Sequence, residues 1–167
     1  MRVRWTPLFA SFWEEKTGTG PDEAGKLTAA VLVFLSRAGG PPPTKKRVPL
    51  VTLKASRRNR SYFYGRQWDD RIILGVSMNP KHYGPKKYYF RKPLLPFYGV
   101  NNVREALVAG IAHEGSHWMD LGLLSHRYFK NRRAKNGSEF ICEIMAVTAL
   151  CHFCRGDQTV KETFEEL

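Results

Sequence analysis

The chain has 167 residues and a formal net charge of +12, with 43% hydrophobic and 25% charged residues. This size and composition favour one globular domain, and an odd number of cysteines argues against a disulfide scaffold. The longest apolar stretch, 27–35, is about half a bilayer span, and polar residues interrupt the N-terminus, so we expect a cytoplasmic protein without membrane anchor or signal peptide.

Basic residues gather before Asn136 and lie among aromatic residues. An excess of positive charge attracts polyanions, so nucleic acid or an acidic protein surface is an expected partner. A solvated face that only keeps the protein in solution is the alternative. No pattern in the sequence indicates an oligomeric state. The basic clusters lie at 45–47, 57–60, 86–87, 91–92 and 127–135.

The N-terminal part, residues 1–43, is predicted to be helical and to end in a Pro-rich connector. Apolar side chains recur at helical spacing over 21–37, and Pro21 suits the first turn of a helix. Gly39 marks the end of that helix, and the prolines that follow it cannot continue one.

Residues 44–78 change to a pattern that is typical of a sheet. Strands are predicted at 48–55, 61–66 and 71–77, and the last is the most strongly apolar. Proline-containing breakers then start a basic and aromatic loop over 79–100.

Residues 101–153 are predicted to form two helices. Asn101 or Asn102 caps the first helix, which runs to about Leu121, and Gly122 is its C-terminal stop.

The second helix is predicted from about Glu139 to Phe153, after a stop and N-cap at 136–138, and an acidic tail over 154–167 follows it. Cys151 and Cys154 on this helix form a single Cys-x-x-Cys pair, which we interpret as core residues. The order of elements predicts one α+β domain, with helices packed on a small, mostly antiparallel sheet.

The first of these helices contains the pattern His-Glu-x-x-His, formed by His113, Glu114 and His117. Side chains four residues apart lie on one face of a helix, so both imidazoles can reach a single metal ion. Glu114 lies beside that face, where it can hold an attacking water. The alternative is a pair of histidines with a structural role, but burying two imidazoles and a carboxylate without an ion is costly. We therefore predict a catalytic zinc site.

A catalytic zinc site takes three protein ligands and keeps one position open. Glu139 and Glu143, one turn apart on the second helix, are the candidates for the third ligand. Glu139 is expected in the first turn, where it can interact with the helix dipole instead. Glu143 lies among apolar neighbours and would be desolvated without a cation, so we favour Glu143. In the reverse order, Glu139 binds the metal and Glu143 supports a ligand from one turn behind.

Further candidates lie outside this core set. His126 is an alternative third ligand, and Asp120 can accept the free ring N–H of a ligand histidine such as His117. Tyr128 and His82 can donate a hydrogen bond to a developing oxyanion.

The motif from His113 to Trp118, followed by a glutamate-bearing helix, resembles the zincin metallopeptidases of the gluzincin type in their small, single-domain form. Together with 137–139 and 143–146, it is also similar to the peptidase domain of ArdC-type antirestriction proteins of plasmids and phages. The resemblance covers residues 103–153. It implies that His113, His117 and the downstream glutamate bind zinc and that Glu114 is the general base.

The resemblance also implies that the sheet edge just before the active-site helix aligns the substrate backbone. That role falls on the strand formed by Ile72, Ile73, Leu74, Gly75, Val76 and Ser77. The chain departs from the family pattern at Gly115-Ser116, which replaces a bulkier apolar pair. It also has Cys142-Glu143 where the ArdC pattern has a doubled glutamate.

These observations predict a zinc-dependent metallopeptidase that acts on a protein or peptide, with a basic surface that directs it to nucleic-acid-associated or acidic targets. Two alternatives remain open. One is a basic nucleic-acid-binding protein in which the zinc site is secondary. The other is a structural component of a phage or mobile element with a structural or degenerate zinc site.

Overall fold

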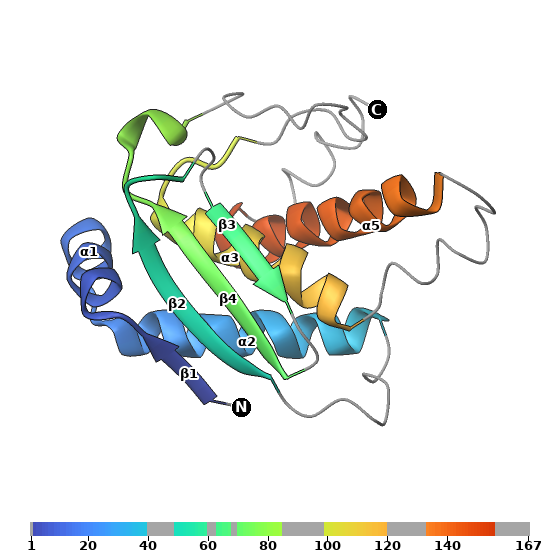
Figure 1. The fold of residues 1–167 in the computed structure, drawn as a ribbon, viewed down its shortest axis with the longest axis horizontal. Coiled ribbons are helices and arrows are strands. Elements are labelled where there is room, and N and C mark those ends of the chain that lie inside the picture. Colours follow the sequence, from blue (N-terminus) through green and yellow to red (C-terminus); the bar gives the residue numbers. More distant parts are fainter. Residues whose placement is uncertain are drawn as a thin grey trace.

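The computed structural model combines a four-stranded sheet with helices that cover one of its faces (Figure 1). It describes residues 2–39, 49–59, 63–67, 70–84, 99–119 and 133–155, with the backbone alone for 39, 133–138 and 140. This mixture of elements confirms the predicted α+β class. The elements in chain order are β1 (Arg2–Trp5), α1 (Pro7–Thr17), α2 (Pro21–Gly39), β2 (Leu50–Ser56), β3 (Phe63–Gln67), β4 (Arg71–Ser77), the short η1 (Pro80–His82), α3 (Val103–Trp118), α5 (Arg133–Leu150) and the π-helical turn η2 (Cys151–Arg155).

The strand order of the sheet is β1-β2-β4-β3. β1 pairs with β2 and β2 with β4 in parallel, whereas β3 pairs with β4 antiparallel. The prediction of a mostly antiparallel sheet is therefore wrong. The reason lies in the N-terminal part, because β1 precedes two helices that cross over to β2, and such a crossover is what parallel neighbours require.

Residues 1–43 thus contain a strand and a helix in addition to the predicted helix. The start of α1 has a clear local cause, because the Thr6 hydroxyl accepts a hydrogen bond from the Phe9 amide (3.3 Å) and Pro7 occupies the first turn. Phe9 and Trp13 then stack in the core, with ring centroids 5.7 Å apart. Burial of these aromatic rings fixes α1 against the sheet and α2.

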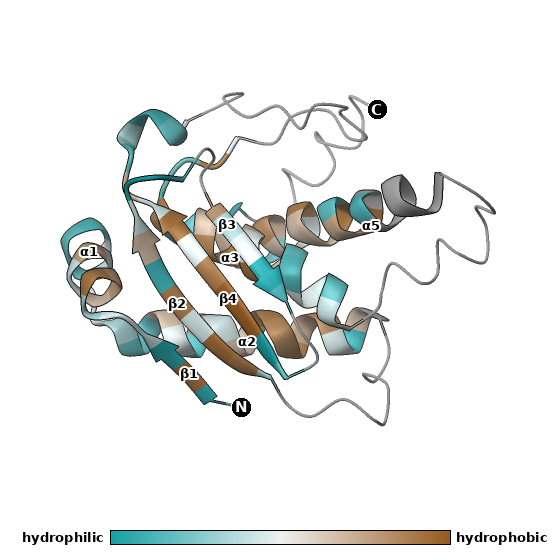
Figure 2. Ribbon diagram, in the orientation of Figure 1, coloured by the Kyte–Doolittle hydropathy of each residue, from teal (hydrophilic) through white to brown (hydrophobic). Residues whose placement is uncertain are grey.

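β4 is the central strand of the core. Its side chains Ile72, Leu74 and Val76 are fully buried beneath the helices, and Figure 2 shows the apolar positions that run along β2 and β4. Its bounds, 71–77, agree with the predicted strand. β4 has a strand on each side and helices over one face, and this burial explains why its sequence is so apolar.

α3 is the central helix and carries the His-Glu-x-x-His motif. Asn102 is its N-cap, because the Asn102 side chain accepts a hydrogen bond from the Glu105 amide at 2.9 Å. The helix ends at Trp118 with Met119 as C-cap, somewhat before the predicted end near Leu121. Leu121 and Gly122 lie outside the described residues.

Two glycines let α3 approach its neighbours closely. A Cβ atom at Gly110 would lie 2.6 Å from Leu74 of β4, and one at Gly115 would lie 2.7 Å from Leu32 of α2. Gly115 is therefore small because α2 packs directly against the motif. This contact explains the departure from the bulkier residue usual inside the motif: the space is filled by Leu32 and Leu35.

α5 begins at Arg133, so the predicted stop and N-cap at 136–138 is wrong. The helix continues through this Asn-Gly-Ser segment, which places Glu139 well inside the helix instead of in its first turn. A glycine in a helix costs about 1 kcal/mol, which the packing of a long helix can offset. Cys151 is buried and Cys154 packs against the core from η2, as expected of core residues.

Several predicted segments lie outside the described residues: most of the Pro-rich connector, the basic clusters at 45–47, 86–87 and 91–92 with most of the loop around them, and the acidic tail from 156 on. Within the described ranges, none of the helices has both the length and the apolar character needed to cross a lipid bilayer.

Candidate metal centre

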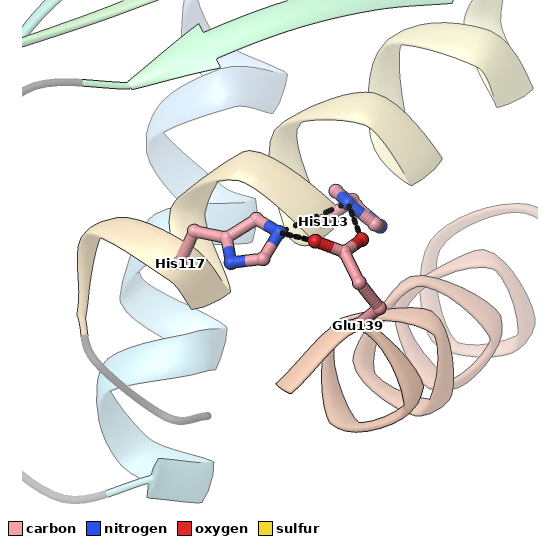
Figure 3. Close-up of side chains that lie close together, drawn as sticks. All are labelled: His113, His117 and Glu139. Atoms are coloured by element: carbon pink, nitrogen blue, oxygen red, sulfur yellow. Dashed lines mark hydrogen bonds and ion pairs between the residues drawn. The ribbon is translucent and has the colours of Figure 1, made fainter. Parts of the chain in front are cut away.

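Three side chains from two helices converge on one point between α3 and α5. His113 and His117 lie one turn apart on α3, and Glu139 reaches toward both from α5 (Figure 3). The two Nε2 atoms lie 3.2 Å apart. The Glu139 carboxylate places Oε2 at 3.3 Å from Nε2 of His113 and Oε1 at 3.2 Å from Nε2 of His117.

These separations fit a metal ion. A tetrahedral ion with bonds of 2.0–2.1 Å holds its ligand atoms about 3.3–3.4 Å apart, which matches the distances between the two nitrogens and the carboxylate oxygens. Two imidazoles and one carboxylate are a donor set for a divalent transition metal. The group formed by His113, His117 and Glu139 can therefore hold a metal ion; below, we call it the HHE site.

Glu143 has a different place from the predicted one. Its Oε1 lies 2.8 Å from Nδ1 of His113, on the side of the ring that faces away from the HHE site. The structure thus reverses the order expected from the sequence: Glu139 joins the two Nε2 atoms, and Glu143 holds the ring of His113. A carboxylate on the far nitrogen of a ligand histidine orients the ring and makes it a better ligand.

The electrostatics of the site favour a cation. Burial opposes the charged form of His113, but hydrogen bonds to Glu139 and Glu143 outweigh it and raise the pKa of the ring to about 10. Hydrogen bonds to His113 and His117 hold the pKa of Glu139 well below its ordinary value. The carboxylates around these rings therefore stabilise positive charge at the point where the ligand atoms converge.

Glu114 lies beside the HHE site under strand β3. Its side chain is buried, and burial raises the pKa of its carboxyl above the ordinary value. Gly65 of β3 packs directly on it, because a Cβ atom at this position would lie 2.2 Å from Oε1 of Glu114. The lack of a side chain at Gly65 is thus what makes room for the Glu114 carboxylate.

The site opens to solvent on one side. The side chain of His113 is 7% exposed, that of His117 18% and that of Glu139 43%, so His113 lies deepest and Glu139 lies nearest to solvent. A pocket of about 490 Å³ lies over these residues and is bordered by Glu114 and by Arg66 and Gln67 at the end of β3. An ion bound here would have an open side that faces this pocket.

The strand at the sheet edge beside the site is β3, not the predicted strand Ile72–Ser77. β4 is hydrogen-bonded to β2 on one side and to β3 on the other, so it has no free edge. β3 is last in the strand order and contributes Arg66 and Gln67 to the pocket. The prediction was wrong because the hairpin after β3 inserts β4 between β2 and β3, which local patterning does not reveal.

Neither a protein-family model, nor a curated protein, nor a solved structure matches this chain.

The remaining predicted site residues do not join the HHE site in the described part of the chain. His82 lies on η1 after the C-terminal end of β4, where its Nδ1 is 2.7 Å from the Ser77 hydroxyl. This contact stabilises the loop after β4, at the end of the strand opposite to the pocket. The predicted role of His82 as an oxyanion donor is therefore not supported. Asp120, His126 and Tyr128 lie outside the described residues.

Gly65, Arg66 and Gln67 border the site and were not predicted as site residues. The sequence could have indicated Gly65, because a glycine inside a strand often marks a place where another group approaches the backbone closely. The approaching group is the Glu114 side chain, from nearly fifty positions further along the chain, so its identity required the tertiary structure.

Proposed function

We propose that this protein is a zinc-dependent metallopeptidase whose ligands are His113, His117 and Glu139 and whose general base is Glu114. One observation carries the proposal: two imidazoles and a carboxylate converge at metal-ligand spacing, with a further buried carboxylate beside an open pocket. Zinc sites that catalyse reactions have three protein ligands and an open side, whereas structural zinc sites are closed by four.

A zinc ion held by these ligands would supply Lewis acidity, which would lower the pKa of a water molecule and polarise a carbonyl group. Glu114 accepts the proton of the attacking water and returns it to the leaving nitrogen of the peptide. Glu143 holds the His113 ring in position through Nδ1.

The substrate backbone would bind along the outer edge of β3. A strand at the edge of a sheet offers unpaired backbone N–H and C=O groups, to which an extended peptide can add as a further strand. β3 ends at Gln67 beside the pocket, so a peptide aligned there would pass over Glu114 and the HHE site.

Hydrolysis of a quenched fluorescent peptide library by the full chain tests this proposal. We expect stoichiometric zinc by elemental analysis, cleavage by the zinc-loaded protein, loss of cleavage with a chelator, and recovery when zinc is restored. Cleavage that is unaffected by complete metal removal, or a zinc-loaded protein that cleaves no peptide in the library, would contradict it.

A Gly65→Ala substitution is expected to lower kcat/KM about 100-fold while zinc stays bound. The new methyl group would displace the Glu114 carboxylate, and misplacing a catalytic group by about 1 Å costs a factor of this size. Gly75→Ala on the neighbouring strand is the matched control, since its Cβ would make only ordinary contacts, the nearest at 3.7 Å. Equal activity of the two variants would show that Gly65 does not position Glu114.

A further inference from the structure

One face of the sheet is not covered by any helix in the described part of the chain. Figure 1 shows α2 and α3 on the same side of the strands. Alternate side chains of β2 and β4, such as Val51, Leu53 and Leu74, are buried on that side. The positions between them on β1, β2 and β3, and at the start of β4, point to the other side and are exposed or half-buried. We call this second side the open face.

The open face is basic. No acidic residue lies in the four strands, whereas the helices α1 and α2 carry charges of both signs. Figure 2 shows hydrophilic positions along β1 and at the adjoining ends of β3 and β4. The exposed basic side chains of the open face are Arg2, Arg4, Lys54 and Arg66, together with Arg71, which is ion-paired with Asp70 at 3.0 Å.

The register of the strands arranges these cations across the sheet. Arg4 pairs with Thr52, Thr52 with Ile73, and Ile73 with Arg66, so one row of the open face has a cation at each end. Three interstrand spacings separate the backbones of Arg4 and Arg66 by about 14 Å. That distance is enough for a chain of several nucleotides to contact cations at both ends.

An exposed aromatic ring lies on the same face. Tyr64 of β3 is 47% exposed, and the Arg66 guanidinium lies 5.5 Å from the centre of its ring. In the neighbouring row, Tyr64 pairs with Gly75 and Gly75 with Lys54. The strand between the ring and Lys54 thus carries a glycine at this position, and the Asn59 side chain donates a hydrogen bond to the Gly75 carbonyl oxygen (2.7 Å). Unpaired bases stack on such rings while nearby cations bind the phosphates.

We propose that the open face of the sheet binds single-stranded nucleic acid. The cations explain attraction to any polyanion, but an exposed ring between cations is specifically suited to a base that is free to stack. A peptide of acidic residues has no base to stack on Tyr64, and the bases of a duplex are already stacked on one another. This face and the HHE site meet at β3, because Arg66 contacts the Tyr64 ring and also borders the pocket over the HHE site.

Fluorescence anisotropy with a labelled single-stranded oligonucleotide tests the proposal on the full chain. The double variant Arg4→Gln/Lys54→Gln is expected to bind at least about tenfold more weakly at low salt, and its salt slope should fall by about 0.7 for each phosphate that the variant no longer neutralises. The matched control is Lys26→Gln/Arg37→Gln, which removes the same charge from exposed positions of α2 and should bind like the parent.

Tyr64 separates stacking from charge. Tyr64→Leu is expected to weaken binding at least about fivefold, and Tyr64→Phe to keep it, because only the ring is needed. Circular dichroism and thermal melting verify that each variant is folded. The proposal is overturned if the two charge variants bind alike, or if the parent binds a duplex or a poly-glutamate peptide as tightly as the single strand. Binding requires no peptidase activity, so this result is independent of the proposed function.

Discussion

Glu114→Gln is expected to lower peptide hydrolysis about 10²–10⁴-fold and to leave the zinc content unchanged. The amide keeps the shape of the carboxylate and fits under Gly65, but it cannot accept a proton from water. Because Glu114 is not one of the three converging ligands, its charge is not needed to hold the ion.

Activity on a peptide substrate and zinc by elemental analysis are measured on the same preparations. Glu15→Gln is the control, since this glutamate is exposed on α1 and pairs with Lys16 at the surface. Parental activity in Glu114→Gln would remove Glu114 as the base. Loss of zinc together with activity would show that Glu114 is a ligand instead.

Glu139→Ala and Glu143→Ala are expected to differ in how strongly they weaken zinc binding. Glu139→Ala removes a ligand, so the protein should lose its zinc during dialysis. Glu143→Ala leaves all three ligands but frees the His113 ring, and the loss of such a partner costs about 10–100-fold in metal affinity.

Competition with a chromophoric chelator measures both affinities. The expected order is parent, then Glu143→Ala, then Glu139→Ala, and Glu143→Gln should restore part of the loss because its amide oxygen can still accept the Nδ1 hydrogen bond. The reverse order, with Glu143→Ala the weaker binder, would reinstate Glu143 as the third ligand.

The two glutamates show why the sequence favoured an order that differs from the observed geometry. The Asn-Gly-Ser segment is a good helix boundary by local chemistry, and that boundary placed Glu139 in a first turn beside the helix dipole. α5 instead begins at Arg133, so Glu139 lies inside the helix, where its carboxylate is 3.3 Å or less from the Nε2 atoms of His113 and His117, and Glu143 lies 2.8 Å from Nδ1 of His113. The start of a helix does not change the spacing of its residues. It did remove one reason for preferring Glu143, because Glu139 is not in the first turn of α5.

The sheet shows a second limit. The strand at 71–77 was predicted with its observed bounds, because a short run of apolar residues indicates a buried strand. Its pairing with β2 and β3 was not predicted, because strand order depends on pairing between segments that are far apart in the sequence. The N-terminal β1 and the hairpin partner β3 flank β2 and β4 and leave β3 at the edge beside the pocket.

By itself, the sequence determined the α+β class, the central strand, the capped helix after Asn102 and the two histidines with the glutamate between them. The α+β class follows from the order of helices and strands along the chain, and the other three depend on residue spacing within one element, which is a local property of the chain. Only the tertiary structure decided that Glu139 lies with the two histidines, that Gly65 makes room for Glu114 and that β3 is the last strand in the order of the described sheet. Each of these depends on the distance between residues of different elements, which packing and strand pairing determine.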